Sequence, residues 1–113
     1  MASDECWLVC DGHVLASAER ARSHGSRARG LLGRDGIGGA LVLAPCRSVH
    51  TIGMRFAIDV AYLDEQGVVL KIARMRRNRV GLPVWKARSI VEAEAGAFDR
   101  WGLVVGQQVE IRE

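Results

Sequence analysis

Short apolar runs joined by tight turns follow one another along almost the whole of this 113-residue chain. The first two runs, ECWLVC and HVLA, flank Asp11-Gly12, a dipeptide that accepts the positive φ angles of a hairpin turn. Parallel βαβ units would need helical segments of about 10–15 residues between strands, and the runs are too closely spaced for them. The pattern therefore predicts a mainly β domain, mostly antiparallel, built as a small sandwich or barrel.

The later runs place the other elements. The strands that we expect are residues 40–44, 57–63, 68–75, 89–96 and 107–113. A short helical turn is expected at residues 97–102. Ser26 can cap one short helix near residues 26–33, which Gly33 can end in the left-handed conformation. Residues 17–23 favour a strand and a helix equally, and this alternative stays open.

Length and composition suit one compact domain over residues 1–113, since 49% of the residues are hydrophobic. The apolar runs are shorter than the roughly 18 residues that a membrane span needs. The first residues, MASDECW, carry acids where a secretory signal would carry bases. Cys6, Cys10 and Cys46 are an odd number, which favours thiols over disulfides. We therefore expect a cytoplasmic protein without a membrane span.

The segment CRSVHTIGMRFAIDVAYLD, residues 46–64, combines polar groups with a core-like strand. If it is pleated from Thr51 to Leu63, alternation turns the even positions into the core and places Arg55 and Asp59 on the other face. We predict that this face is the floor of a groove. The residues expected to line it are His50, Thr51, Arg55 and Asp59, with Arg29 or Arg34 from the helix end.

A guanidinium and a carboxylate in such a groove suit recognition of a small polar or anionic ligand, or of a peptide from a partner protein. We therefore predict a binding module that is not an enzyme and needs no cofactor.

Positive charge is concentrated between Lys71 and Arg88. This segment has seven basic residues and no acidic one, whereas the rest of the chain has nine basic and thirteen acidic residues. As alternatives, the segment could bind a nucleic acid, an acidic protein or a membrane surface. A solvated strand edge, protected from aggregation by its charge, is the simpler interpretation. The candidate contacts for an anionic partner are Lys71, Arg74, Arg76, Arg77, Arg79 and Trp85.

The sequence patterns for catalysis and for metal binding are weaker than those for binding an anion or a partner. Cys46, His50 and Asp59 are the residue types of a thiol nucleophile, its base and an orienting acid, so a Cys/His-dependent enzyme is a second alternative. A catalytic thiol needs a positive or helix-terminal setting that lowers its pKa, and nothing in the sequence shows that His50 reaches Cys46, so we assign no catalytic residue. The chain has no Cys-x-x-Cys pair, so no metal site is expected.

Four segments in a fixed order carry a resemblance to a known family. RARGLLGR, CRSVHTIGMRFAIDVAYLDEQGVV, SIVEAEAG and GLVVGQQVEI together resemble the bacterial and archaeal domain-of-unknown-function family 192, also called uncharacterised protein family 0127. The resemblance covers about residues 14–111. It implies a compact β-rich domain, and no activity is established for the family.

Overall fold

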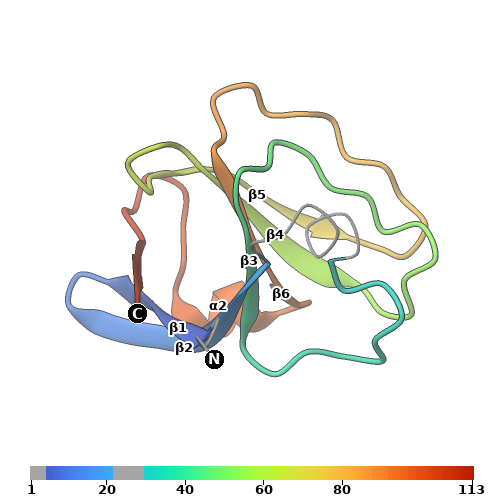
Figure 1. Ribbon diagram of the computed structural model, residues 1–113, viewed down its shortest axis with the longest axis horizontal. Coiled ribbons are helices and arrows are strands. Elements are labelled where there is room, and N and C mark those ends of the chain that lie inside the picture. The colour runs from blue at the N-terminus through green and yellow to red at the C-terminus, as the bar shows by residue number, and fades with distance from the viewer. Residues whose placement is uncertain (1–4, 22–29) are drawn as a thin grey trace.

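The computed structural model describes residues 5–21 and 30–113, and its strands form one curled sheet (Figure 1). The strand order is β5-β4-β6-β3-β2-β1-β7. Neighbouring strands are antiparallel except β2 and β3, which are parallel. The mainly β, mostly antiparallel fold is therefore confirmed. The strands are β1 (Glu5–Cys10), β2 (His13–Ala21), β3 (Ala40–Leu43), β4 (Ile58–Leu63), β5 (Val69–Met75), β6 (Ser89–Glu94) and β7 (Glu110–Arg112).

The hairpin turn predicted near the N-terminus and the short helix predicted near the C-terminus are both confirmed. Asp11 and Gly12 turn β1 into β2 with φ angles of 51° and 78°. Residues 17–21 belong to β2, so the open alternative is a strand as far as the structure describes it. The helix expected at residues 97–102 is α2 (Ala97–Trp101). Within the described ranges, no helix is long and apolar enough to cross a lipid bilayer.

The helix expected near residues 26–33 is only partly covered by the structure. Residues 26–29 lie outside the described ranges, and residues 30–33 form a turn in which Gly33 has the expected positive φ of 85°. The single domain expected over residues 1–113 includes these uncovered positions and stays a prediction.

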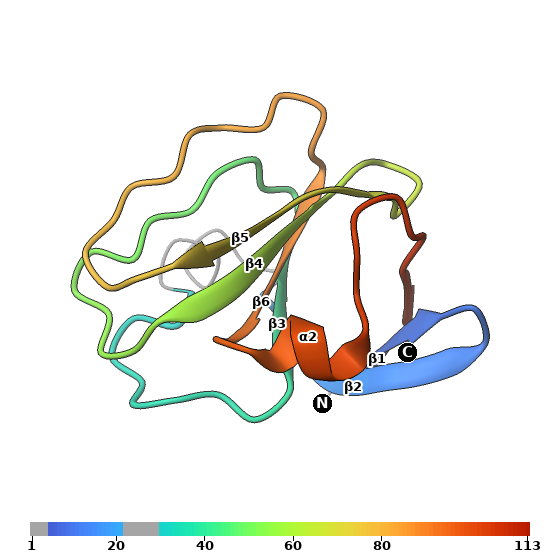
Figure 2. The ribbon, with the colours of Figure 1, turned by 180° about the vertical axis from the view of Figure 1, so that it is seen from behind.

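The sheet curls until the start of β5 meets the chain that leads into β7. Val69 N–H donates to the Gln107 carbonyl at 2.8 Å, and Val109 N–H donates to the Gly67 carbonyl at the same distance. A side chain at Gly67 would lie 2.3 Å from the Val109 carbonyl oxygen, so the two segments approach this closely only because residue 67 is glycine. The result is a half-barrel with α2 at one end and the β4–β5 turn at the other (Figures 1 and 2).

Two apolar cores lie on the two faces of the curled sheet. The side chains of Ile58, Val60 and Tyr62 on β4 enter one core, and those of Ala61 and Leu63 enter the other. The alternation predicted for this strand is therefore confirmed from Ile58 onward. The face predicted to be a shallow groove is instead a packed core, closed by Phe98 of α2.

The groove prediction required a pleated chain from Thr51 onward, and this is wrong for residues 51–57, because these residues form turns and bends. Met54 N–H donates to the Thr51 carbonyl, and Gly53 has a φ of 80°, a combination that reverses the chain. Residues 44–57 therefore form a long loop. This loop lies beside residues 76–88 (Figures 1 and 2). Side chains from both segments, Met54 and Val84 among them, pack in the core that contains Tyr62.

Candidate functional site

Asp59 holds the start of α2 in place and does not face an open groove. Its side chain is 4% exposed, and its carboxylate accepts hydrogen bonds from Gly96 N–H at 3.0 Å and Phe98 N–H at 3.2 Å. Because Gly96 has no side chain to cap the helix, the carboxylate on β4 does so from another strand. Arg74 Nε also donates to Asp59, at 2.9 Å, and this bond raises the pKa of Arg74 above its ordinary value.

Arg55 lies away from Asp59. Its guanidinium pairs with Asp35 at 2.8 Å, and both side chains are well exposed. The carboxylate of Asp59 is already occupied by α2 and Arg74. The structure therefore does not bring Arg55 and Asp59 into one groove, because residues 51–57 bend instead of continuing the strand.

The other residues predicted to line the groove are also dispersed. Arg34 pairs with Glu19 at 3.3 Å, on the side of β2. His50 is exposed and forms an isolated β-bridge with Val80. Arg29 lies outside the described residues. A ligand-binding role for these residues stays a prediction.

Hydrogen bonds of Thr51 join the loop of residues 44–57 to the loop of residues 76–88. It is completely buried, and its hydroxyl donates to the Arg76 carbonyl while accepting a hydrogen bond from Arg79 N–H at 2.9 Å. Its backbone N–H donates to the Arg79 carbonyl at 2.7 Å, and its carbonyl accepts from Asn78 N–H at 2.9 Å. One small polar residue thus sets the position of Arg76 and Arg79.

We expect Thr51→Val to lower the free energy of unfolding by about 2 kcal/mol. Valine has the shape of threonine, but it leaves the Arg79 N–H and the Arg76 carbonyl without the hydroxyl that they bond. Chemical denaturation measures this change. Thr51→Ser keeps the hydroxyl and is expected to lose less. Equal losses in the two variants would show that the hydroxyl does not hold the loops together.

A hollow of about 430 Å³ lies between the edge strand β5 and the loop of residues 76–88. Four of the six residues predicted to contact an anionic partner line it. We call this hollow the basic pocket. Its charged lining residues are Lys71, Arg74, Arg76 and Arg79, and its other lining residues include Tyr62, Val80 and Leu82.

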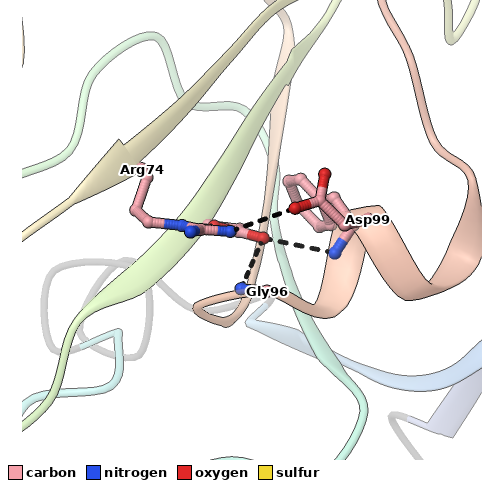
Figure 3. A network of polar contacts seen from close by, with 5 residues as sticks. Arg74, Gly96 and Asp99 are labelled. Atoms are coloured by element: carbon pink, nitrogen blue, oxygen red, sulfur yellow. Dashed lines mark hydrogen bonds and ion pairs between the residues drawn. The ribbon is translucent and has the colours of Figure 1, made fainter.

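The positive charge of the basic pocket is neutralised mainly at Arg74, which pairs with Asp59 and approaches Asp99 at 3.5 Å (Figure 3). In residues 5–21 and 30–113, no carboxylate forms an ion pair with Lys71, Arg76 or Arg79. Several unpaired cations around one hollow repel one another, and an anion placed among them would relieve that repulsion.

Tyr62 forms part of the lining of the basic pocket. Burial raises the pKa of its phenol, and the charges of Cys46 and Glu92 raise it further, so the phenol is a neutral hydroxyl at physiological pH. Lys71 Nζ lies 5.8 Å from the centroid of the Tyr62 ring. A side chain at Gly81 would lie 3.2 Å from the Tyr62 hydroxyl and 2.9 Å from the Val49 carbonyl, so a larger residue would crowd this end of the pocket.

Two residues of the predicted patch lie outside the pocket lining. Arg77 is exposed, and no ion pair involves it within the described ranges. Trp85 is 76% exposed on the same loop. The sequence predicted this charge cluster, but alternation along an extended strand would place Arg76 and Arg79 on opposite faces. In the structure, the loop of residues 76–88, which Thr51 holds by hydrogen bonds, places Arg76 and Arg79 at one pocket.

Cys46 and Asp59, two of the three residue types of a thiol enzyme, lie on opposite faces of the sheet. Cys46 packs against the core that contains Tyr62, and its thiol donates to the Ser48 carbonyl at 3.2 Å. Asp59 lies on the opposite face of the sheet, with Phe98. Asp59 is therefore not placed to orient a base for Cys46. Among the residues that the structure describes, no three His, Cys, Asp or Glu side chains are grouped to hold a metal ion.

A second hollow, of about 730 Å³, opens at the end of the half-barrel opposite α2. Arg20 and Arg88 line it together with Asp64 and Glu65, so its charges are mixed. Arg20 is paired with Glu113 at 3.2 Å, and Asp64 accepts hydrogen bonds within its own turn. We call this hollow the barrel-mouth cleft. Sequence reasoning missed it because its lining comes from segments far apart in the chain.

Sequence reasoning also missed Glu92, which is 2% exposed on β6. Its cross-strand neighbours are Leu41 and Val60, and its Oε1 has no hydrogen-bond partner within the described part of the chain. Burial raises its pKa to about 7. Alternation along the strand could have predicted that Glu92 is buried, because Glu92 shares a face with the buried Ile90.

One family model and two solved structures are similar to this chain. The sequence model of DUF192, described as an uncharacterized ACR, matches residues 8–111. A protein of unknown function from Novosphingobium aromaticivorans DSM 12444 has a similar structure, with a TM-score of 0.78 and 19% identity over 94% of this chain and 83% of that chain. A protein of Sinorhizobium meliloti 1021, described provisionally as a transcription regulator, has a TM-score of 0.75 and 17% identity over 97% of this chain and 94% of that chain.

At these identities the two structures show a shared fold and nothing more. No curated protein matches the chain. The match to the family extends from β1 to β7. The chain belongs to the DUF192 family of proteins of unknown function.

Proposed function

We propose that this protein binds a small anion, with phosphate or carboxylate groups, in the basic pocket and that it acts as a binding module, not as an enzyme. One observation carries the proposal: Lys71, Arg76 and Arg79 line one hollow, and no carboxylate in the described residues pairs with them. The site is a recess between a strand edge and a loop, where charge is screened less than on an open surface.

The lining groups have complementary roles in this proposal. The guanidinium of Arg76 can offer two parallel N–H donors to a phosphate or carboxylate. Arg79 Nη1 donates to the Arg77 and Asn78 carbonyls at 3.3 Å, so its Nε and Nη2 are the donors left for the anion. Lys71 supplies a compact charge on the strand side of the pocket. Arg74 pairs with Asp59, which lies beside Phe98 on the other face of the sheet, so its guanidinium is not among the proposed anion contacts. Thr51 positions the loop that carries Arg76 and Arg79, neither of which forms an ion pair with a carboxylate in the described residues.

The test is thermal unfolding of the purified protein with inorganic phosphate, pyrophosphate and citrate. A ligand that binds only the folded state and is present at about 100 times its dissociation constant raises the Tm of a domain of this size by about 10 °C. We expect such a rise for at least one of the three anions. The double variant Lys71→Ala/Arg76→Ala is expected to lose it.

Lys86→Ala is the matched control, because Lys86 is an exposed cation on the same loop that does not line the pocket. This variant should keep the full rise. The proposal fails if none of the anions raises the Tm of the wild type, or if the double variant responds as strongly as Lys86→Ala does.

Nucleic-acid binding through the same segment remains the alternative that the sequence raised. Arg76, Arg77 and Arg79 supply charge, and the exposed Trp85 is one aromatic residue on which a base could stack. The relative from Sinorhizobium meliloti, described provisionally as a transcription regulator, shares the fold at 17% identity. A small anion is favoured because the cations gather at a recess and the segment offers a single exposed stacking residue.

Location in the cytoplasm also stays a prediction.

A further inference from the structure

We propose that the anion is the headgroup of an anionic phospholipid, and that the face around the basic pocket docks on a membrane surface. The inference rests on the proposed function and names the ligand of the same pocket. It is carried by a second property of this face, namely the apolar side chains that stand exposed beside the charged ones.

Val80, Leu82 and Trp85 form what we call the apolar rim. Their exposed fractions are 71%, 78% and 76%, the three largest among the exposed large hydrophobic side chains of the described residues. Val80 and Leu82 line the basic pocket, and Trp85 follows on the same loop. Single exposed apolar residues are ordinary on protein surfaces, but three within one short loop beside a cationic recess mark an interaction site.

The loop is held so that these side chains stay exposed. Gly81 N–H donates to the Val49 carbonyl and Val84 N–H to the Arg47 carbonyl, each at 2.9 Å. Val84 packs on the core and Ala87 is completely buried. With the backbone fixed and these residues turned inward, Leu82 and Trp85 cannot reach the core without breaking the loop.

The segment that carries the apolar rim has charge of one sign. Residues 71–88 contain no acid, and Arg76, Arg77, Arg79 and Lys86 are all exposed. Exposed basic residues are attracted to anionic lipids, and tryptophan and leucine enter the boundary between headgroups and acyl chains. A recess of about 430 Å³ suits a headgroup, which would sit among the cations while the apolar rim enters the lipid.

The aliphatic side chains favour a membrane over a nucleic acid. Val80 and Leu82 provide no flat ring for a base to stack on, yet they are 71% and 78% exposed. A lipid surface uses both properties of this face, whereas a nucleic acid would leave the aliphatic side chains without a contact.

The experiment is co-sedimentation of the full chain with vesicles. We expect binding to vesicles of mixed phosphatidylcholine and phosphatidylglycerol, and no binding to pure phosphatidylcholine. Leu82→Ser/Trp85→Ser should weaken the partition by about tenfold or more, since two apolar side chains lose their burial in lipid. Val105→Ser is the control, because Val105 is 58% exposed but lies on the segment between α2 and β7.

The outcomes separate this inference from the proposed function. Both side chains are exposed, so the double serine variant is expected to fold and to keep its response to inorganic phosphate. If the protein binds phosphate but not anionic vesicles, or if the double serine variant sediments like the wild type, the membrane inference is wrong and the anion site stands. Loss of the phosphate response in Lys71→Ala/Arg76→Ala, together with its loss of vesicle binding, supports both proposals. Preference for a single-stranded oligonucleotide over vesicles, abolished by Arg77→Ala, would overturn the membrane inference.

Discussion

Replacement of Asp59 by alanine is expected to lower the free energy of unfolding by about 3 kcal/mol. The carboxylate accepts from the backbone N–H groups of Gly96 and Phe98 and from the guanidinium of Arg74, and its own side chain is 4% exposed. Alanine would leave the first turn of α2 without its cap and the buried Phe98 N–H without a partner. Urea denaturation at neutral pH measures the loss.

Asp99→Asn provides the control for this prediction. Asp99 approaches the same Arg74 at 3.5 Å, but its side chain is 88% exposed, so its removal is expected to change the free energy of unfolding far less. If Asp59→Ala were as mild as Asp99→Asn, the carboxylate would not be the group that holds α2 on the sheet.

Replacement of Glu92 by glutamine is expected to stabilise the protein above pH 7. Burial raises the pKa of the Glu92 carboxyl from 4.5 to about 7, so above that pH the folded protein must hold an unpaired charge between apolar neighbours. A shift of this size corresponds to about 3 kcal/mol, which glutamine would recover because it is neutral and of the same shape.

The pH dependence has a definite sign. Between about pH 4.5 and 7 the unfolded chain has lost the Glu92 proton while the folded protein keeps it, so the contribution of this group to stability falls as the pH rises. We expect the wild type and Glu92→Gln to converge in stability at pH 4 and to separate by pH 8. Glu94→Gln, at an exposed position on the same strand, should show no such divergence. Parallel stability curves for the wild type and Glu92→Gln would contradict the assignment.

Alternation of apolar residues predicted most of the sheet because it reports directly on burial. It places Ile58, Val60 and Tyr62 correctly, and the hairpin at Asp11-Gly12 follows from the φ angles that its residues accept. The same alternation continues before Ile58, where it misled the prediction. There the chain turns at Gly53, and the apolar side chains that follow, such as Met54, reach the core from a loop.

The site was only partly predictable, because the positions of charged side chains depend on contacts far away in sequence. Asp59 has the carboxylate that the sequence suggested for a ligand, but α2, more than thirty-five residues later, occupies it. The clustering of cations was visible in composition. Their convergence was not, since Arg76 and Arg79 are positioned by the hydroxyl of Thr51 in another loop.

The most direct test of the account is a titration of the isotope-labelled protein with inorganic phosphate, followed by NMR. If the basic pocket is the anion site, the largest amide shift changes will occur at Lys71, Ala73 and Gly81, which line it. Changes that are largest at Gly67 and Ser89, which line the barrel-mouth cleft, or no saturable changes at all, would contradict the account.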